Sequence, residues 1–157
     1  MSFVIIHQDI TQLAVDAIVN AANPELLRGD GVCGAIFRAA GATKLQAACQ
    51  KLAPIQTGQA VITPGFNLAA KYIIHAVGPV YQRQDPAQSA RLLRLAYTNS
   101  LRLAVEYKCA SIAFPLISSG VYGYPAALAQ QVAAAAIQAF LREHELEVTL
   151  VLFDRQT

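Results

Sequence analysis

The sequence predicts an α/β protein, a three-layer α/β/α sandwich around a central mixed sheet of about six strands. Short runs rich in β-branched residues alternate with longer helical runs along the 157 residues. The runs at 72–78 and 111–117 are apolar on both faces, which predicts helices on both sides of the sheet. A content of 55% hydrophobic and 14% charged residues fits such a doubly covered sheet.

Six segments have the length and composition of β-strands, and each is bounded by polar or turn-forming residues. The expected strands are FVIIHQD (3–9), AIVNAA (17–22), AVIT (60–63), YIIHAVG (72–78), SIAFPLI (111–117) and VTLVLF (148–153).

Three helical stretches lie between these strands. The first begins near Cys33 and should break around Gly41. The second and third follow Pro86 and Pro125, each placed as a first-turn residue. In the second stretch, helical spacing predicts one apolar face made of Leu92, Leu95, Ala96, Leu103 and Val105.

Length, charge and cysteine content exclude several classes of protein. We expect one domain over residues 1–157, monomeric and cytoplasmic, without a signal peptide or membrane span. Three cysteines without CxxC spacing argue against a disulfide framework or a thiolate metal site, and we expect neither a metal nor a cofactor. The net charge of +2 comes from scattered basic residues, which makes a nucleic-acid partner unexpected.

Two glycine-rich loops each follow a strand and lead into a helix. They are AANPELLRGDGVCG (21–34) and SSGVYGYP (118–125). Each loop brings backbone N–H groups and a helix amino terminus to the carboxyl edge of the sheet, where they can bind anions. Facing one another, the loops would clamp a diphosphate with little help from side chains, because Arg28 and Arg38 are the only nearby cations. Ordinary tight turns are the alternative, while the GxxxxGK[ST] and dinucleotide-binding patterns are absent.

Five segments in this order resemble the motifs of the macrodomain family of ADP-ribose-binding modules. They are HQDIT, DAIVNAAN, GDGVCGAIFRAAG, YIIHAVGP and PLISSGVYGYP, and they span residues 7–125. The overall pattern is most similar to bacterial members that act as ADP-ribosyl hydrolases and O-acetyl-ADP-ribose deacetylases. The resemblance implies ADP-ribose and its esters as ligands and mono-ADP-ribosylated proteins as partners.

The resemblance also implies the residues of the site. Asp9 would accept a hydrogen bond from the adenine amine beside the Ile10 N–H, unless Asp9 only caps its own turn. Asn20 would brace the loop through the backbone, and Asn23 would reach the distal ribose. Residues implied around the ligand are Asp9, Ile10, Asn23, Asp30, Gly31, Val32, Cys33, Ser118, Ser119, Gly120, Val121, Tyr122 and Phe153, with Asp154 beside the last. Phe153 could instead belong to the core.

Two positions depart from the bacterial hydrolases. Cys33 stands where they carry aspartate and Phe37 where they carry histidine. Cys33 would offer its backbone N–H; a thiol acidified at the helix amino terminus is the alternative. The GDGVC loop resembles that of alphavirus macrodomains, which remove mono-ADP-ribose from proteins. Asn23, Gly31, Cys33 and Tyr122 form the expected catalytic set, with a water activated by the substrate's own diphosphate.

Three functions therefore stand as hypotheses. The first is a hydrolase of ADP-ribose esters, and the second is a non-catalytic reader of ADP-ribose or ADP-ribosylated proteins. The third is a nucleic-acid-binding protein, which the scattered basic residues disfavour.

Overall fold

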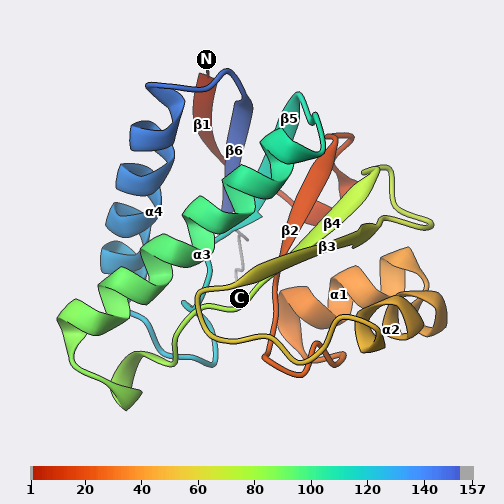
Figure 1. The fold of residues 1–157 in the computed structure, drawn as a ribbon, viewed down its shortest axis with the longest axis horizontal. Helices are drawn as coiled ribbons and strands as arrows, with labels where there is room; N and C mark the ends of the chain where they lie inside the picture. The colour runs from red at the N-terminus through yellow and green to blue at the C-terminus, as the bar shows by residue number, and fades with distance from the viewer. Residues whose placement is uncertain (1, 153–157) are drawn as a thin grey trace.

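A computed structural model of the protein describes residues 2–152 and contains one six-stranded sheet covered by helices on both faces (Figure 1). Phe153 and Asp154 lie outside the described residues. The elements in chain order are β1 (Ser2–His7), η1 (Ile10–Gln12), β2 (Ala17–Ala21), α1 (Gly31–Ala40), α2 (Ala42–Gln50), β3 (Ala60–Pro64), β4 (Tyr72–Ala76), η2 (Tyr81–Arg83), α3 (Pro86–Glu106), β5 (Ser111–Pro115), α4 (Ala126–Leu141) and β6 (Glu147–Leu152).

The strand order is β1-β6-β5-β2-β4-β3, and only β3 runs antiparallel to its neighbour. The predicted mixed sheet is thus confirmed. Helices α3 and α4 cover one face, and α1 and α2 cover the other (Figure 1). Alternation along β2 shows why both faces are apolar: Ala17 and Val19 join the core under α3 and α4, while Ile18 joins the core under α1 and α2. No helix within residues 2–152 combines the length and apolarity needed to span a bilayer.

The predicted helix break at Gly41 is confirmed. Gly41 has φ 106° and serves both as the residue that ends α1 and as the residue that precedes α2. Pro86 occupies the first turn of α3 as expected. Pro125 lies one position earlier, as the residue before α4, which begins at Ala126.

The predicted apolar face of α3 was wrong. Of the five residues named for it, only Ala96 is fully buried, and Val105 is exposed. The buried face instead contains Leu93, Tyr97, Leu101 and Ala104. A run rich in leucine permits two helical faces, and the structure buries the face whose small alanines let α3 approach the sheet. Tyr97 can join this face because its hydroxyl donates to the Pro115 carbonyl (3.0 Å) and accepts from the Ile117 N–H (3.0 Å).

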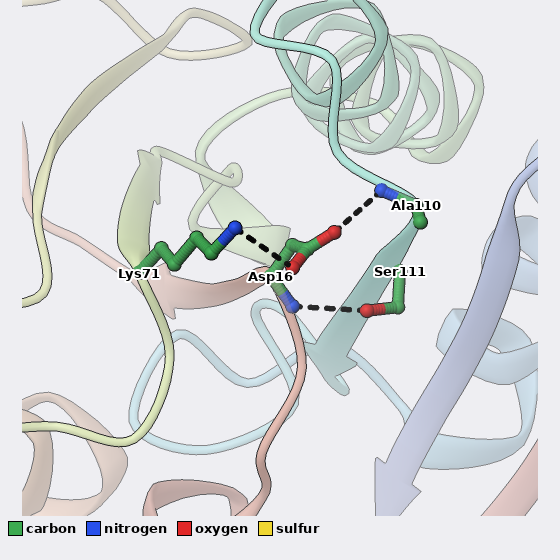
Figure 2. A network of polar contacts seen from close by, with 4 residues as sticks. All are labelled: Asp16, Lys71, Ala110 and Ser111. Atoms are coloured by element: carbon green, nitrogen blue, oxygen red, sulfur yellow. Dashed lines mark hydrogen bonds and ion pairs between the residues drawn. The ribbon is translucent and has the colours of Figure 1, made fainter.

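Asp16 joins the starts of three strands, at the amino end of β2 (Figure 2). Its carboxylate accepts from the Ala110 N–H (2.6 Å), and its own N–H donates to Ser111 Oγ (2.9 Å). Its carbonyl accepts from the Tyr72 N–H (3.0 Å), and Lys71 Nζ lies 3.9 Å from its carboxylate. This residue therefore fixes the spacing of β2, β4 and β5 at the edge opposite the predicted loops.

Replacing Asp16 with alanine is expected to lower the free energy of unfolding by about 1–3 kcal/mol, because the Ala110 N–H loses a charged acceptor. Lys71→Ala removes only an exposed ion pair and should cost less than about 1 kcal/mol. Urea denaturation of both variants checks this ranking. A larger loss for Lys71→Ala than for Asp16→Ala would contradict it.

Candidate functional site

A cavity of about 930 Å³ opens where the two glycine-rich loops meet at the carboxyl edge of the parallel strands. Its volume lies in the range of small-molecule sites. The predicted residues that line it are Asp9, Ile10, Asn23, Asp30, Gly31, Val32, Cys33, Ser118, Ser119, Gly120, Val121 and Tyr122. The structure thus brings together every predicted site residue within residues 2–152, from both loops and from the segment after β1.

Hydrogen bonds within the first loop come from Asn23 and from α2. Asn23 Oδ1 accepts from the Leu27 N–H and Nδ2 donates to the Leu27 carbonyl, both at 2.9 Å. Gln46 of α2 accepts from the Arg28 N–H and donates to the Leu26 carbonyl, each at 3.0 Å. Asn23 therefore braces the loop and also lines the cavity. The role of Gln46 was missed, because nothing in the sequence signals which helical glutamine reaches a loop eighteen residues away.

The amino end of α1 faces the cavity. Asp30 precedes the helix without a side-chain cap, so the first N–H groups of α1 have no side-chain acceptor from Asp30. Gly31 has φ 60°, a conformation that favours glycine. Gly34 packs so tightly on the loop that a Cβ added there would lie 2.5 Å from the Gly29 carbonyl oxygen. This close approach sets the loop against the helix and presents an anion site to the cavity.

The second loop is fixed from its far side. Ser118 has φ 70°, and its hydroxyl donates to the Pro79 carbonyl at 2.8 Å. The Tyr124 N–H donates to the Ser118 carbonyl, and the Tyr81 N–H donates to the Tyr122 carbonyl, both at 2.9 Å. Because the Ser118 hydroxyl bonds Pro79, the loop has chiefly backbone groups to offer the cavity. The Tyr122 ring lines the cavity half-buried, and burial raises the pKa of its phenol.

Asp9 caps its own turn, which is one of the two roles that the sequence left open, and it also lines the cavity. Its Oδ1 accepts from the Thr11 N–H (3.0 Å) and from Thr11 Oγ1 (2.7 Å), which caps η1. Both of these bonds use Oδ1, and within residues 2–152 no hydrogen bond reaches Oδ2. Asp9 also lines the cavity, so a turn-capping aspartate keeps one oxygen for a ligand.

Cys33 is not an acidified thiol. Burial raises its pKa, and this effect outweighs the Asn20 amide and the Gly29 backbone, which lower it. The thiol lies 3.7 Å from the Leu27 carbonyl. Burial of the sulfur disfavours the thiolate alternative, and all three cysteines in the described residues are free and buried.

Asn20 contacts side chains rather than the backbone predicted for it. Its Nδ2 lies 3.1 Å from His75 Nδ1 and 3.7 Å from Cys33 Sγ, and its buried Oδ1 has no partner within the described part of the chain. An amide donating to Nδ1 places the imidazole proton on Nε2, which faces Thr63 Oγ1 at 3.0 Å. Burial lowers the pKa of His75 to about 4, so the imidazole is neutral near pH 7.

Within residues 2–152, the cavity therefore brings no histidine into contact with Cys33. Asn20 separates His75 from Cys33, as the sequence indicated when it offered no Cys/His dyad. His75 Nε2 lies 3.8 Å from Cys49 Sγ, but burial raises the pKa of that thiol to about 11. Phe37 is buried in the core under α1 and does not line the cavity. Residues 2–152 hold no group of three His, Cys, Asp or Glu side chains suited to a metal ion.

Several cavity-lining residues were missed by sequence reasoning, among them Gly78 and Gln130. Gly78 follows β4 and lines the cavity, and a Cβ there would collide with Ser118 Oγ. Its position in the YIIHAVGP motif could have identified it as a site residue. Arg38 of α1 and Gln130 of α4 also line the cavity, and no pattern distinguished Gln130 from its neighbours in an alanine-rich helix.

Comparison with known proteins gives consistent results. The family profile of the Macro domain matches residues 19–133. A macro domain-containing protein of Lactiplantibacillus plantarum is 51% identical over 156 residues, covering 98% of this chain and 90% of that protein. The O-acetyl-ADP-ribose deacetylase of Salmonella typhimurium is 51% identical over 158 residues, covering 98% of this chain and 88% of the enzyme.

Solved structures agree with the fold. The Oceanobacillus iheyensis macrodomain with ADP has a TM-score of 0.89 and 42% identity, covering 96% of this chain and 83% of that one. The Trypanosoma brucei macrodomain in complex with ADP-ribose has a TM-score of 0.87 and 38% identity, covering 96% and 63%.

Proposed function

This chain belongs to the macrodomain family, and from that membership we propose that it binds ADP-ribose and hydrolyses ADP-ribose esters. The proposed substrates are O-acetyl-ADP-ribose and proteins mono-ADP-ribosylated on acidic side chains. The observation that carries the proposal is the single cavity in which the uncapped end of α1 faces the second glycine-rich loop. A monomeric, cytoplasmic protein is part of the proposal and is consistent with three free cysteines.

The cavity offers a suitable group for each part of ADP-ribose. Asp9 Oδ2 would accept from the adenine amine beside the Ile10 N–H. The first N–H groups of α1 and the backbone of the second loop would hold the diphosphate. Asn23 and the Tyr122 ring would enclose the distal ribose.

Hydrolysis in this site would depend on positioning. The Cys33 thiol is neutral, and His75 is buried behind Asn20, so neither supplies a base. A diphosphate oxygen of the substrate would hold and polarise a water beneath the anomeric carbon of the distal ribose. Asn23 would fix the sugar, and the loop N–H groups would stabilise the developing charge. For a protein ester, the water oxygen bonds the anomeric carbon as the bond from that carbon to the carboxylate oxygen breaks, and the water proton passes through the diphosphate oxygen to the leaving carboxylate. For O-acetyl-ADP-ribose, the same water would add to the acetyl carbonyl carbon, and the ribose hydroxyl would leave with the proton. Either reaction yields ADP-ribose and the carboxylic acid.

Asn23→Ala is expected to slow release of free ADP-ribose from an auto-mono-ADP-ribosylated acceptor by roughly 10- to 100-fold, because the ribose loses its orientation. Tyr122→Ala should act in the same direction. The rate of the parent should stay flat between about pH 5.5 and 8, since the proposed mechanism requires no protein base with a pKa in that range. Asn99→Ala is the matched control, because Asn99 bonds the Gly58 carbonyl away from the cavity.

Two results would contradict this mechanism. An Asn23→Ala variant as fast as the parent would show that ribose orientation does not limit the rate. A bell-shaped pH profile with a limb near pH 6.5 would reveal a general base of ordinary histidine pKa.

Cys33→Ala is expected to keep the rate within about threefold of the parent, because the residue offers its backbone rather than its thiol. Cys33→Asp should weaken ADP-ribose binding, because a carboxylate would stand beside the diphosphate. Turnover and calorimetric titration measure the two effects. Loss of turnover in Cys33→Ala with unchanged affinity would assign the thiol a chemical role.

A reader of ADP-ribosylated proteins is the second candidate. The neutral, buried thiol at Cys33, in place of a carboxylate, favours it. Micromolar or tighter binding of ADP-ribose, about −8 kcal/mol or better, without release of ADP-ribose from a modified acceptor would establish the reader. Absence of any binding heat would remove both candidates.

A further inference from the structure

The α4 side of the cavity carries a polar side chain that the proposed function does not use. Ala126 and Gln130 lie one helical turn apart, and both line the cavity. Gln130 is half-buried, while its neighbour Gln131 is exposed. The face of α4 toward the sheet is apolar and includes Ala129 and Ala133, so Gln130 lies at the edge of that buried face.

The chain topology places Gln130 near the adenosine half of the cavity. Helix α4 connects β5 to the parallel strand β6, so it runs back along the sheet and begins at the carboxyl edge of β6 (Figure 1). At that edge, Leu152 pairs with His7, and Asp9 follows two residues later. Leu152 and Asp9 line the same cavity as Gln130. Gln130 therefore lines the same cavity as Asp9, where adenine is proposed to bind, and the loop that precedes α4.

The Gln130 carboxamide is available for a ligand. Within residues 2–152 no hydrogen bond joins it to another group, whereas the side chains of Gln46 and Gln84 bond backbone carbonyls. Within residues 2–152, Asn20 Oδ1 is the only buried side-chain polar atom without a partner, so the Gln130 amide is open to solvent, and a ligand in the cavity can replace its water contacts with direct hydrogen bonds. A carboxamide offers two N–H donors and a carbonyl acceptor, which match the donor and acceptor capacity of two neighbouring hydroxyls.

We propose that Gln130 binds the 2′,3′-diol of the adenosine ribose and makes the site discriminate ribonucleotide from deoxyribonucleotide ligands. This inference rests on the proposed function, because the ribose is placed by the adenine at Asp9 and the diphosphate at the two loops. The amide would donate to one hydroxyl and accept from the other. A ligand lacking one hydroxyl would leave part of the amide unpaired, which is how sites of this kind reject such analogues.

The test is calorimetric titration with ADP, 2′-deoxy-ADP and 3′-deoxy-ADP. The parent protein should bind ADP about 5- to 10-fold more tightly than at least one deoxy analogue, the effect of one lost hydrogen bond. Gln130→Leu, which keeps the size of the side chain, should bind ADP and both analogues within about twofold of one another. Gln131→Leu, the exposed neighbour, should keep the preference of the parent. Thermal unfolding of each variant confirms that it is folded, and Gln130→Ala provides a second truncation.

Each outcome separates this inference from the proposed function. A preference retained by Gln130→Leu and Gln130→Ala overturns the assignment of Gln130. Equal affinity of the parent for all three nucleotides, with ADP-ribose still bound, overturns the inference alone. Failure of the parent to bind ADP and ADP-ribose overturns the proposed function, and this inference with it.

Discussion

Replacing Gly34 with alanine is expected to weaken ADP-ribose binding by about 100-fold or more and to lower the free energy of unfolding by about 1–3 kcal/mol. Alanine is normally preferred over glycine inside a helix by roughly 0.5–1 kcal/mol. At this position the sign reverses, because the new methyl group would lie 2.5 Å from the Gly29 carbonyl oxygen. Helix α1 and the loop would have to separate, which displaces the N–H groups proposed to bind the diphosphate.

Gly29→Ala is the matched control, on the other side of the same contact. A Cβ at Gly29 would meet Cys33 Sγ at 3.7 Å, which is ordinary van der Waals distance. Its free energy of unfolding should therefore stay within about 0.5 kcal/mol of the parent. Urea denaturation and calorimetric titration with ADP-ribose measure both variants. A Gly34→Ala protein as stable as Gly29→Ala would contradict this prediction, because it would show that the loop can move away from α1 without lowering the free energy of unfolding.

Lowering the pH from 7 to 4 is expected to remove about 3 kcal/mol of stability through His75 alone. Burial lowers its pKa from 6.5 to about 4, so the unfolded chain takes up the proton first. The contribution of His75 is therefore fully present above pH 6.5 and is lost as the pH falls toward 4. Burial explains the direction, because the fully buried imidazole loses the solvation of its charged form.

Urea denaturation of the parent and of two histidine variants across this pH range separates the contribution of His75 from that of the carboxylates. His75→Gln should be less stable at pH 7 and should lose about 3 kcal/mol less than the parent on acidification. His144→Gln, at an exposed position near the end of α4, should follow the parent curve. Parallel curves for the parent and His75→Gln would mean that the pKa of the imidazole is the same in the folded and unfolded chains.

The sequence was informative where structure depends on neighbouring residues. The strand positions were predicted from apolar runs bounded by turn residues. The helix break was predicted from the glycine at position 41, and the structure gives that residue a φ of 106°. Both loops reach one cavity because the carboxyl ends of parallel strands share an edge of the sheet.

Contacts between distant segments were not predictable in this way. The Asn20–His75 bond joins residues 55 positions apart, and its existence depends on the register of β2 against β4. The buried face of α3 was misassigned for a similar reason, since the partners of the Tyr97 hydroxyl lie 18 and 20 residues further along the chain. Local periodicity cannot reveal a partner supplied by another strand.

The pairing of the first strand with the last has a consequence for synthesis. Within residues 2–152, β1 lies at the edge of the sheet and pairs with β6 alone, Ser2–His7 against Glu147–Leu152. During translation, β1 emerges before the other described strands and has no strand partner until β6 has been synthesised. Closing so long a segment is entropically costly, which favours late docking of β1. Asp9 follows β1 directly, so the adenine end of the site would be completed last, and affinity for the nucleotide would appear only when the sheet has closed.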